Sequence, residues 1–579
     1  MMTKYGFVLA KNHDNNVEEK QLSQMNRIVW EGYSVHYNPL PKFENDKLFY
    51  HNKDRLVLLD GVIFNKQDLI EKYHSIDWRT AFDAIYDEYG ITCIDLLRGS
   101  FCGIIIDQRQ KETLYAFSNH TGERPIYYHK DANGLCDLVA SHVNFMEGFI
   151  KSKNEKLIPS IESAYMLLST GSCLGNNTPF ENIFRITAGK YIEANAIGVK
   201  ELWYHMFRNV PEWEKSLDDL IEEGDKLFRQ AEKRIYGKNQ EYGYESECDL
   251  SGGLDSRMAT YVAHELGYEA ILNMCYCIEG NLDNIISKQI AHDLGNRYSF
   301  LNMDGNVLMD IDQNVDLVGG QVIYSVGTGS RRSLEQIDTS NLGMCCTGLL
   351  GELENAYWIE GNEHTPANYI RSSSRFSNFY PLKLSKEIHQ PYENYEQENI
   401  YEHSLQLFIS STIIRQQITE VTSPFFDVDY IDFIFKVPLK YRMNYKYLTT
   451  WMMKKYPKAA EYVWQAKGIP VKNWVTGEKF DHNYLLDMTD FSKQKINGVF
   501  RKANIKFQFS RISDMNPTYT WYCKNKELRN YIDNYFNNNI AAVENKQLQI
   551  DLRNMFKKGT PMDKILVCNY LGINKRYFV

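Results

Sequence analysis

Hydrophobic residues in the first part of the chain form short runs separated by turns. Residues 56–65 are an apolar run with a turn-prone centre at Asp60-Gly61. Residues 101–107 and 113–117 are two further runs, and the charged segment between them predicts a β-hairpin. We therefore expect a β-rich structure with some helices in this part of the chain.

Farther along, strand patterns and helix patterns alternate. Residues 244–250 have a strand pattern and residues 258–267 an amphipathic helical pattern, and residues 271–277 and 284–294 repeat the pair. Such alternation predicts a parallel sheet with helices on both faces and ligands at the carboxyl ends of the strands.

Length and composition describe a globular protein of more than one domain. The 579 residues exceed what one core normally organises, and 43% are hydrophobic against 24% charged. A net charge of −9 without a long basic run argues against nucleic acid or an anionic membrane as a partner. No stretch has the pattern of a signal peptide or a membrane span, and the 11 cysteines lack paired spacing. We expect reduced thiols in a cytoplasmic protein.

The most informative segment lies between the strand at 244–250 and the helix at 258–267. A glycine turn in this place leaves backbone N–H groups at a helix N-terminus, where they favour a phosphate. The carboxylate of Asp255 would repel that phosphate unless a cation lies between them, which predicts Mg²⁺. The simpler alternative is a tight turn with a capped helix. The residues expected to bind the phosphates are Leu250, Ser251, Gly252, Gly253, Leu254, Asp255 and Ser256.

This heptad resembles the pyrophosphate-binding loop of the ATP pyrophosphatases, which cleave ATP to AMP and pyrophosphate. It lacks the spacing of a P-loop, so transfer of the γ-phosphate is not expected. The preceding segment, residues 245–249, is unusually acidic for a parallel strand. We expect only residues 248–250 to be deeply buried.

Three earlier segments occur in the order found in the glutaminase domain of the asparagine synthetase family: residues 59–65, 97–101 and 122–128. Together with the loop they resemble that family over about residues 1–475. The resemblance implies an α/β protein with an Ntn-hydrolase-like αββα glutaminase-type domain over residues 1–210. A doubly wound ATP-pyrophosphatase domain (adenine nucleotide α-hydrolase-like) would follow over residues 211–475. Helical patterns predict an extension of that domain over residues 476–579.

The nucleophile of the glutaminase reaction is missing from the matching position. In this family an N-terminal cysteine attacks glutamine, with its own α-amino group as the base. The matching residue here is Met2, whose thioether cannot form a thioester, and the nearest cysteine is Cys93. Val62 replaces a glutamate of the family pattern. We expect an inactive glutaminase domain; the alternative is that Thr3 becomes N-terminal and acts as the nucleophile, one residue out of register.

The second half carries further segments of the family pattern. The resemblance implies that Tyr276 lies beside the bound ATP, that Thr347 and Gly348 line its phosphates, and that Glu352 holds Mg²⁺ opposite Asp255. Leu349 stands where asparagine synthetases carry a glutamate that helps to deprotonate the amine. A leucine can do no proton transfer, which argues against plain asparagine synthesis.

Three other residues receive roles from this pattern. Residues 423–427, Ser-Pro-Phe-Phe-Asp, resemble a helix-start motif near the site, and Lys467 occupies the place of a catalytic lysine. The alternative for Lys467 is a solvated surface charge. Asp283 precedes a predicted helix, and we expect it to be the N-cap.

The expected function is an AMP-forming amide ligase that uses ATP and Mg²⁺ to join a carboxylate substrate to an amine or ammonia. Asp255, Glu352 and Lys467 would carry the catalysis. A specialised tailoring enzyme, such as a peptide macrolactam cyclase of the lasso type or a β-lactam synthetase-like ligase, fits best. The alternatives are an ammonia-dependent asparagine synthetase, an enzyme amidating sugar acids in a surface-polysaccharide pathway, and a non-catalytic nucleotide-binding protein. The substrate remains open, as does the choice between monomer and dimer.

Overall fold

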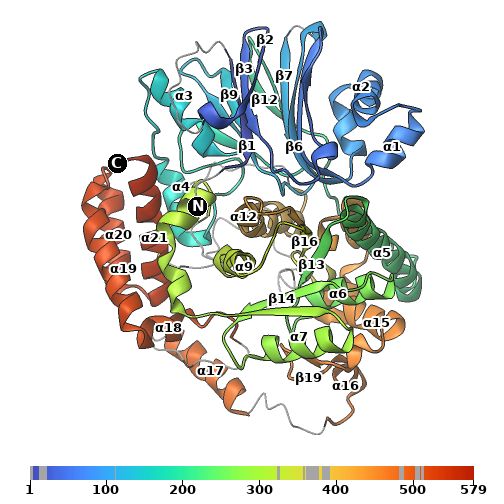
Figure 1. Ribbon diagram of the computed structural model, residues 1–579. Coiled ribbons are helices and arrows are strands. Elements are labelled where there is room, and N and C mark those ends of the chain that lie inside the picture. The colour runs from blue at the N-terminus through green and yellow to red at the C-terminus, as the bar shows by residue number, and fades with distance from the viewer. Residues whose placement is uncertain are drawn as a thin grey trace.

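The computed structural model describes residues 4–11, 22–110, 112–322, 326–356, 359, 377, 379–380, 392–480, 488–502, 509 and 514–579. Two six-stranded antiparallel sheets make up the first part (Figure 1). Their orders are β10-β8-β9-β1-β3-β2 and β12-β11-β7-β6-β5-β4. The strands are β1 (Gly6–Lys11), β2 (Asn26–Trp30), β3 (Tyr33–Asn38), β4 (Leu48–His51), β5 (Arg55–Ile63), β6 (Gly99–Asp107), β7 (Thr113–Ser118), β8 (Ile126–Lys130), β9 (Cys136–Ala140), β10 (Ile183–Ile186), β11 (Lys190–Asn195) and β12 (Gly198–Trp203).

The two sheets stack face to face because successive side chains alternate between their faces. Phe7 and Leu9 of β1 are buried between the sheets, whereas Val8 and Ala10 face outward into a second core. Helices α1 (Lys66–Lys72) and α2 (Trp78–Tyr89) cover the outer face of the second sheet, and α3 (Glu147–Ser152) and α4 (Ile161–Thr170) pack on the first. The predicted αββα arrangement is therefore confirmed.

The hairpin predicted from residues 101–117 is confirmed as β6 and β7, but the turn predicted at Asp60-Gly61 is wrong. Strand β5 continues through these residues and pairs with β6 along its whole length. Gly61 has a φ of 134°, and a Cβ there would lie 2.1 Å from the carbonyl oxygen of Ser100. A glycine is required because the neighbouring strand approaches too closely for any side chain.

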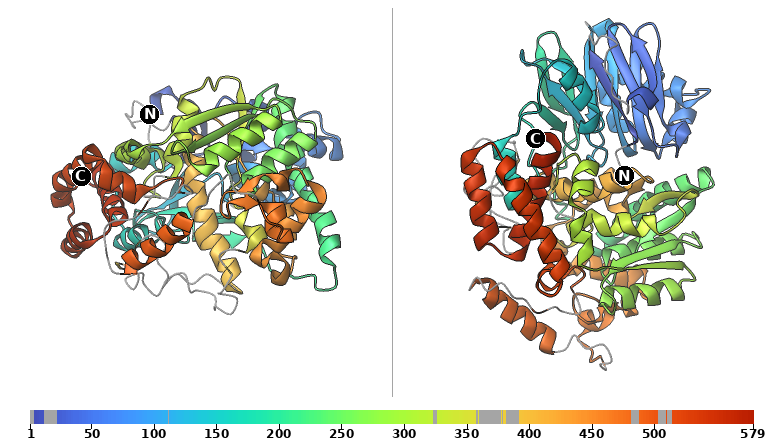
Figure 2. Two further views of the ribbon diagram at one scale, coloured as in Figure 1. Left: turned by 90° about the horizontal axis from the view of Figure 1, so that it is seen from below. Right: turned by 60° about the vertical axis from the view of Figure 1, so that its left-hand side comes forward.

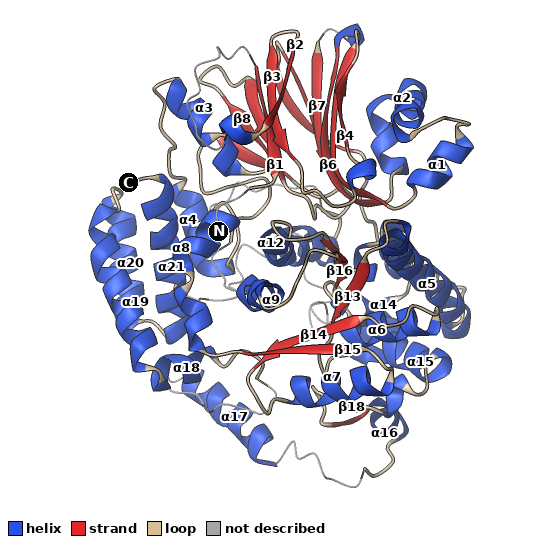
Figure 3. Cartoon of the chain, in the orientation of Figure 1, coloured by secondary structure: helices blue, strands red, loops and turns tan. Residues whose placement is uncertain are grey.

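A five-stranded parallel sheet organises the second part, with the order β15-β14-β13-β16-β17 (Figure 3). Its chain order reverses between β13 and β16, which is the switch point of a doubly wound sheet, as predicted. Helix α5 (Leu217–Glu241) and α6 (Asp255–Glu265) pack on one face, while α9 (Val326–Glu335) packs on the other. The strands are β13 (Glu245–Asp249), β14 (Leu272–Cys277), β15 (Arg297–Asn302), β16 (Leu342–Cys346) and β17 (Val421–Thr422).

The acidic strand β13 is buried more deeply than predicted. Glu247 is 0% exposed, so the expectation that burial begins at residue 248 is wrong. Arg415, at the end of α12 (Leu405–Arg415), lies 3.9 Å from Glu247 and forms an ion pair with Asp249. Because Glu247 and Asp249 project from the same face of the strand, one buried guanidinium faces both carboxylates.

The C-terminal helices pack against both parts of the chain (Figure 2, right). Helix α21 (Pro561–Tyr577) shares a hydrophobic core with α4 and with the outer face of the first sheet. Tyr577 donates a hydrogen bond to Asn144 at 2.7 Å, and Arg576 pairs with Glu147 and Asp316. Helices of residues 518–577 therefore stabilise the N-terminal sandwich as well as the second part, and the limits of the three domains stay predictions.

The remaining α-helices lie between the strands of the parallel sheet or follow them in the chain. No helix among the residues with a described structure is both long and apolar enough to span a bilayer. These helices are α7 (Leu282–Asp293), α8 (Ile311–Leu317), α10 (Glu352–Asn355), α11 (Tyr395–Asn399), α13 (Val428–Ile434), α14 (Leu439–Arg442), α15 (Lys446–Lys455), α16 (Val471–Thr476), α17 (Met488–Lys502), α18 (Thr518–Lys524), α19 (Lys526–Asn539) and α20 (Lys546–Lys558).

Candidate functional site

The loops after β13 and β16 meet at the carboxyl edge of the parallel sheet. Asp255 is the first residue of α6, and Glu352 is the first residue of α10. A Cβ on Gly351 would lie 2.4 Å from the Asp255 carboxyl carbon, and one on Gly348 would lie 2.5 Å from the Ser256 nitrogen. Segment 347–352 therefore crosses the start of α6 so closely that only glycine fits at these two positions.

Three carboxyl groups lie around this crossing. Burial, and then the negative charge of Glu352, raises the pKa of Asp255 to about 7. Burial, and then the charge of Asp255, raises the pKa of Glu354, which accepts a hydrogen bond from the Tyr430 hydroxyl. Glu352 adds negative charge beside the buried Asp255, and a hard divalent cation would neutralise such a pair of carboxylates, so Asp255 and Glu352 fit Mg²⁺. Glu354 was missed because it lies beyond the recognised motif, and only the turn of α10 brings it near.

The backbone N–H groups of the glycine loop have acceptors within the protein. Ser251 N–H donates to the Ser256 hydroxyl at 3.0 Å, and Gly253 N–H donates to the Ser251 hydroxyl at 3.1 Å. Gly252 N–H donates to the Asp283 carboxylate at 2.8 Å. A phosphate at this loop would compete with these acceptors for the same donors.

The N-cap prediction for Asp283 is wrong. The cap of α7 is Asn281, whose side chain accepts from Asp283 N–H at 2.8 Å. The Asp283 carboxylate is turned toward the glycine loop instead, and burial raises its pKa to about 6. Because α7 begins at Leu282, Asn281 takes the N-cap position and Asp283 lies within the first turn.

The predicted phosphate-lining residues Thr347 and Gly348 are held in place by the following strand. Thr347 N–H donates to the Thr422 carbonyl at 3.0 Å, and the Ser423 hydroxyl lies 2.8 Å from the carbonyl oxygens of both Thr347 and Leu349. The helix-start motif is confirmed, since Asp427 caps α13 by accepting from Asp429 and Tyr430 N–H.

Leu350 adopts a backbone conformation that normally requires glycine. Its φ is 72°, and its side chain is fully buried in the core of the second part. A bulky residue in the left-handed region is strained, and such strain persists only where the surrounding structure holds it. The strained residue lies directly between Leu349 and the glycine that touches Asp255.

Lys467 lies on a hairpin that is attached to the glycine loop. The carbonyl of Gly252 accepts from Gln465 N–H at 3.1 Å and from the Arg257 guanidinium at 3.0 Å. Arg257, fully buried, also donates to the Val463 carbonyl of the hairpin at 2.6 Å. The ammonium of Lys467 is exposed and rests 5.4 Å from the ring centroid of Trp464.

Arg257 was missed by the sequence reasoning. Burial lowers its pKa to about 10, and its donors reach backbone carbonyls of one distant segment, residues 459–463. An arginine directly after the heptad, at a position of α6 that faces the core, was the signal in the sequence.

Tyr276 stands at the end of β14, one strand away from the glycine loop. Its hydroxyl donates to Asp249 at 3.2 Å and lies 3.2 Å from the Arg415 guanidinium. The ring packs so closely on α9 that a Cβ on Gly329 would lie 2.9 Å from it. The structure therefore places Tyr276 in a buried polar network beneath the sheet edge; contact with ATP stays a prediction.

A pocket lies beside the first residues of β1 in the sandwich. Met2 and Thr3 lie outside the described residues. Burial raises the pKa of the Cys102 thiol far above its usual range and that of Cys93 to about 12, so neither is a ready nucleophile. The pocket is lined by Tyr5, Asp60, Cys102, Arg124, Gln416 and Gln417, among others.

Charged groups from both parts of the chain close the base of this pocket. Arg124 pairs with Asp60 at 3.1 Å and with Glu420, which precedes β17. Lys47 lies 3.4 Å from the same Glu420. Gln417 accepts from Lys4 N–H at 2.8 Å, so the first described residues are also tied to the second part.

An αββα sandwich is thus followed by a doubly wound sheet with an acidic, glycine-lined edge. A family model for a glutamine amidotransferase domain matches residues 44–205. Asparagine synthetase [glutamine-hydrolyzing] 1 of Arabidopsis thaliana is 23% identical over 305 residues, which cover 50% of this chain and 45% of the relative. Asparagine synthetase [glutamine-hydrolyzing] 2 of Oryza sativa subsp. japonica is 22% identical over 302 residues, which cover 50% of this chain and 44% of the relative.

These matches confirm the predicted resemblance to the asparagine synthetase family. The matched region spans about half the length of the curated relatives. A solved structure of the allosteric regulatory enzyme of purine biosynthesis aligns with 51% of this chain and 74% of its own, at 9% identity and a TM-score of 0.23. That likeness adds nothing to the description of the fold.

Proposed function

We propose that this protein is an AMP-forming amide ligase. The observation that carries the proposal is the meeting of Asp255 and Glu352 at the switch point of the parallel sheet, with Gly348 and Gly351 making room between them. Ligands of doubly wound sheets bind at this edge, and two neighbouring acids there fit the cation that accompanies a nucleotide.

The reaction would proceed in two steps. An oxygen of the substrate carboxylate attacks the α-phosphorus of ATP, the bond to pyrophosphate breaks, and an acyl-adenylate forms. The nitrogen of an amine then attacks the acyl carbon, AMP leaves, and the nitrogen loses a proton. Bound Mg²⁺ would offset the charge of the departing pyrophosphate.

Residues of this chain would bind and orient the reactants. The N-terminus of α6, with Ser251 and Ser256 beside it, would hold pyrophosphate oxygens once the internal hydrogen bonds of the loop open. Lys467 would leave its aromatic ring contacts and approach the phosphates from the adjoining hairpin. Arg257 would position that hairpin without touching the substrate.

The amine is proposed to come from the substrate, a second substrate or free ammonia. Glutamine is not proposed as its source, because Cys102 is a buried thiol and Arg124 is paired with Asp60 among the pocket residues that the structure describes. Leu349 contributes no base for ammonia, which favours a specialised tailoring ligase over plain asparagine synthesis.

We expect the protein to release no glutamate from glutamine. The full chain would be incubated with glutamine, with and without MgATP, and glutamate would be measured by a coupled dehydrogenase assay. Release should match the buffer background, and Cys102→Ser should not change it. Steady release that Thr3→Val eliminates would contradict the prediction and establish the threonine alternative.

The proposed function is tested by screening carboxylates. The full chain would be incubated with MgATP and a panel of amino acids, sugar acids and peptides that carry both a side-chain carboxyl and an amine. AMP, pyrophosphate and amide should form in equal amounts with one class of carboxylate. Formation of ADP and phosphate would contradict the proposal.

One observation favours a second candidate, a non-catalytic nucleotide-binding protein. The loop donors already have internal acceptors, and Asp283 places a carboxylate where an anion would bind. MgATP binding without AMP formation across the whole panel would support this candidate.

A further inference from the structure

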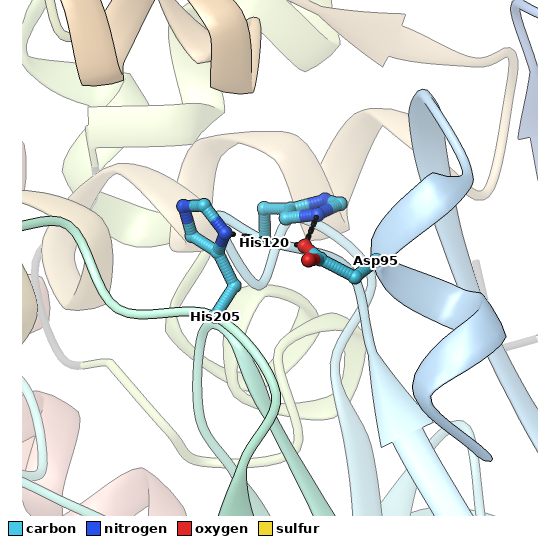
Figure 4. A group of neighbouring side chains, drawn as sticks. All are labelled: Asp95, His120 and His205. Carbon is cyan, nitrogen blue, oxygen red and sulfur yellow. Dashed lines mark hydrogen bonds and ion pairs between the residues drawn. The ribbon is translucent and has the colours of Figure 1, made fainter. Parts of the chain in front are cut away.

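A second cluster of potential metal ligands lies at the joint between the sandwich and the second part. Figure 4 shows Asp95, His120 and His205 directed toward one another. Asp95 lies in the 3₁₀ helix Gly90–Leu96, His120 follows β7, and His205 follows β12. Their donor atoms all lie within 4.8 Å of one another.

The geometry of the cluster suits a tetrahedral ion. One oxygen of Asp95, Oδ1, lies 3.1 Å from His120 Nε2 and 3.1 Å from His205 Nδ1. Ligands bound to zinc at 2.0–2.1 Å are about 3.3 Å apart in a tetrahedron. Two of the three donor separations are close to this spacing, and the third is within 4.8 Å.

The surroundings of the two imidazoles also resemble a built metal site. His205 Nε2, on the side of the ring away from Asp95, lies 3.4 Å from the Asp432 carboxylate on α13. A metal-bound histidine generally directs its other nitrogen at a carboxylate in this way. His120 is 3% exposed and its ring packs edge-to-face on Tyr204 at 5.3 Å.

The cluster is accessible, and the carboxylates of Asp95 and Asp432 lie beside its imidazoles. The side chain of Asp95 is 44% exposed, which leaves an entry path and a fourth position for water. The nearest cation, Arg98, is engaged elsewhere: its guanidinium pairs with Asp429 at 2.9 Å and donates to the Asp95 carbonyl.

We infer that Asp95, His120 and His205 form a binding site for one zinc-like transition metal ion, positioned by Asp432. Two imidazoles and a carboxylate with an open fourth position are typical of Zn²⁺, and the nitrogen donors select against Mg²⁺. The ion would fasten the segment after β12 to the sandwich and, through Asp432, to the second part. This site is independent of the proposed ligase activity.

Binding of Zn²⁺ to the full, chelator-treated chain tests the inference. A Cys523→Ser background removes the exposed thiol, and isothermal titration calorimetry with metal analysis after gel filtration measures affinity and stoichiometry. One Zn²⁺ per chain should remain bound in the presence of millimolar Mg²⁺. Co²⁺ should bind in its place and give the visible absorption of a tetrahedral site.

Variants distinguish Zn²⁺ binding at this site from Zn²⁺ binding elsewhere on the protein. Asp95→Asn, His120→Gln and His205→Gln should lose the ion, and Asp432→Asn should weaken binding by roughly 10- to 100-fold. His292→Gln, a change at an exposed histidine of α7, and the Asp255→Asn/Glu352→Gln pair should bind Zn²⁺ as the parent does. Because Asp95 is half-exposed, its variant should fold even where a change at buried His120 does not.

Two results would overturn the inference: a parent protein that retains no Zn²⁺, or folded Asp95→Asn and His205→Gln variants that retain it with unchanged affinity and the same Co²⁺ spectrum.

Discussion

Replacing Asp255 with asparagine is expected to weaken Mg²⁺-dependent binding of ATP strongly. The carboxylate lies against Gly351 and next to Glu352, so its loss removes one of two charges that would hold the cation. Loss of a metal ligand at a phosphate site removes several kcal/mol of charge stabilisation, and we expect affinity to fall on the order of a hundredfold or more. Calorimetric titration with MgATP measures the effect, and Glu352→Gln should behave alike.

The same substitution should leave the ligand-free fold at least as stable, and this separates a lost site from a lost structure. The pKa of Asp255 rises from 3.8 to about 7 on folding, so the native state binds this proton more tightly than the unfolded state. The wild type therefore loses stability as the pH rises from 3.8 to about 7. Asp255→Asn removes that loss, and its melting temperature at pH 8 should equal or exceed that of the wild type.

Asp218→Asn, which alters an exposed carboxylate on α5, provides the matched control and should bind MgATP normally. If Asp255→Asn and Glu352→Gln both bind MgATP as tightly as this control, the cation site lies elsewhere.

Lys467→Ala should bind MgATP nearly as well as the wild type and yet form the acyl-adenylate very slowly. In the ligand-free protein the ammonium rests over the aromatic rings of Tyr445, Trp464 and Trp474. Each exposed contact of this kind contributes about 0.5–1 kcal/mol, little enough for the lysine to leave when charge develops nearby. Removing a group that acts only in the transition state lowers the rate by about 10²- to 10³-fold.

The measurement is pyrophosphate release with the carboxylate identified in the screen. Lys467→Arg should also be slow, because a planar guanidinium does not replace a compact ammonium. Lys472→Ala, at an exposed lysine of α16, is the control. Equal rates for Lys467→Ala and wild type would show that Lys467 is a surface charge.

Much of the fold was predictable where the determinants are local. The glycine-rich heptad followed by an amphipathic run predicted the turn and helix α6, and the alternating pattern predicted the parallel sheet. The pairing of Asp255 with Glu352 was implied by the family resemblance. The structure accounts for it, because β13 and β16 are neighbours at the switch point and present their loops together.

The errors arose where a residue's environment is set by a distant part of the chain. The acidic residues of strand β13 predict that the start of the strand is exposed, because nothing near them in sequence indicates that Arg415 will face their carboxylates. The sequence predicts that the Asp283 side chain caps its own helix. Instead, it accepts a hydrogen bond from Gly252 N–H, 31 residues earlier. Local patterns identify which groups are polar, but tertiary packing decides which groups they meet.

The shared core of helix α21 and the first sheet has a consequence for biosynthesis. Val8 and Ala10 belong to the same hydrophobic core as helix α21, but that helix, residues 561–577, is synthesised long after them. At about 5–20 residues per second, the sheet and α4 wait roughly 20–80 s for this helix. During that interval the nascent sandwich exposes an apolar surface, so chaperone binding to polysomes should concentrate on chains that carry α4 but not yet α21.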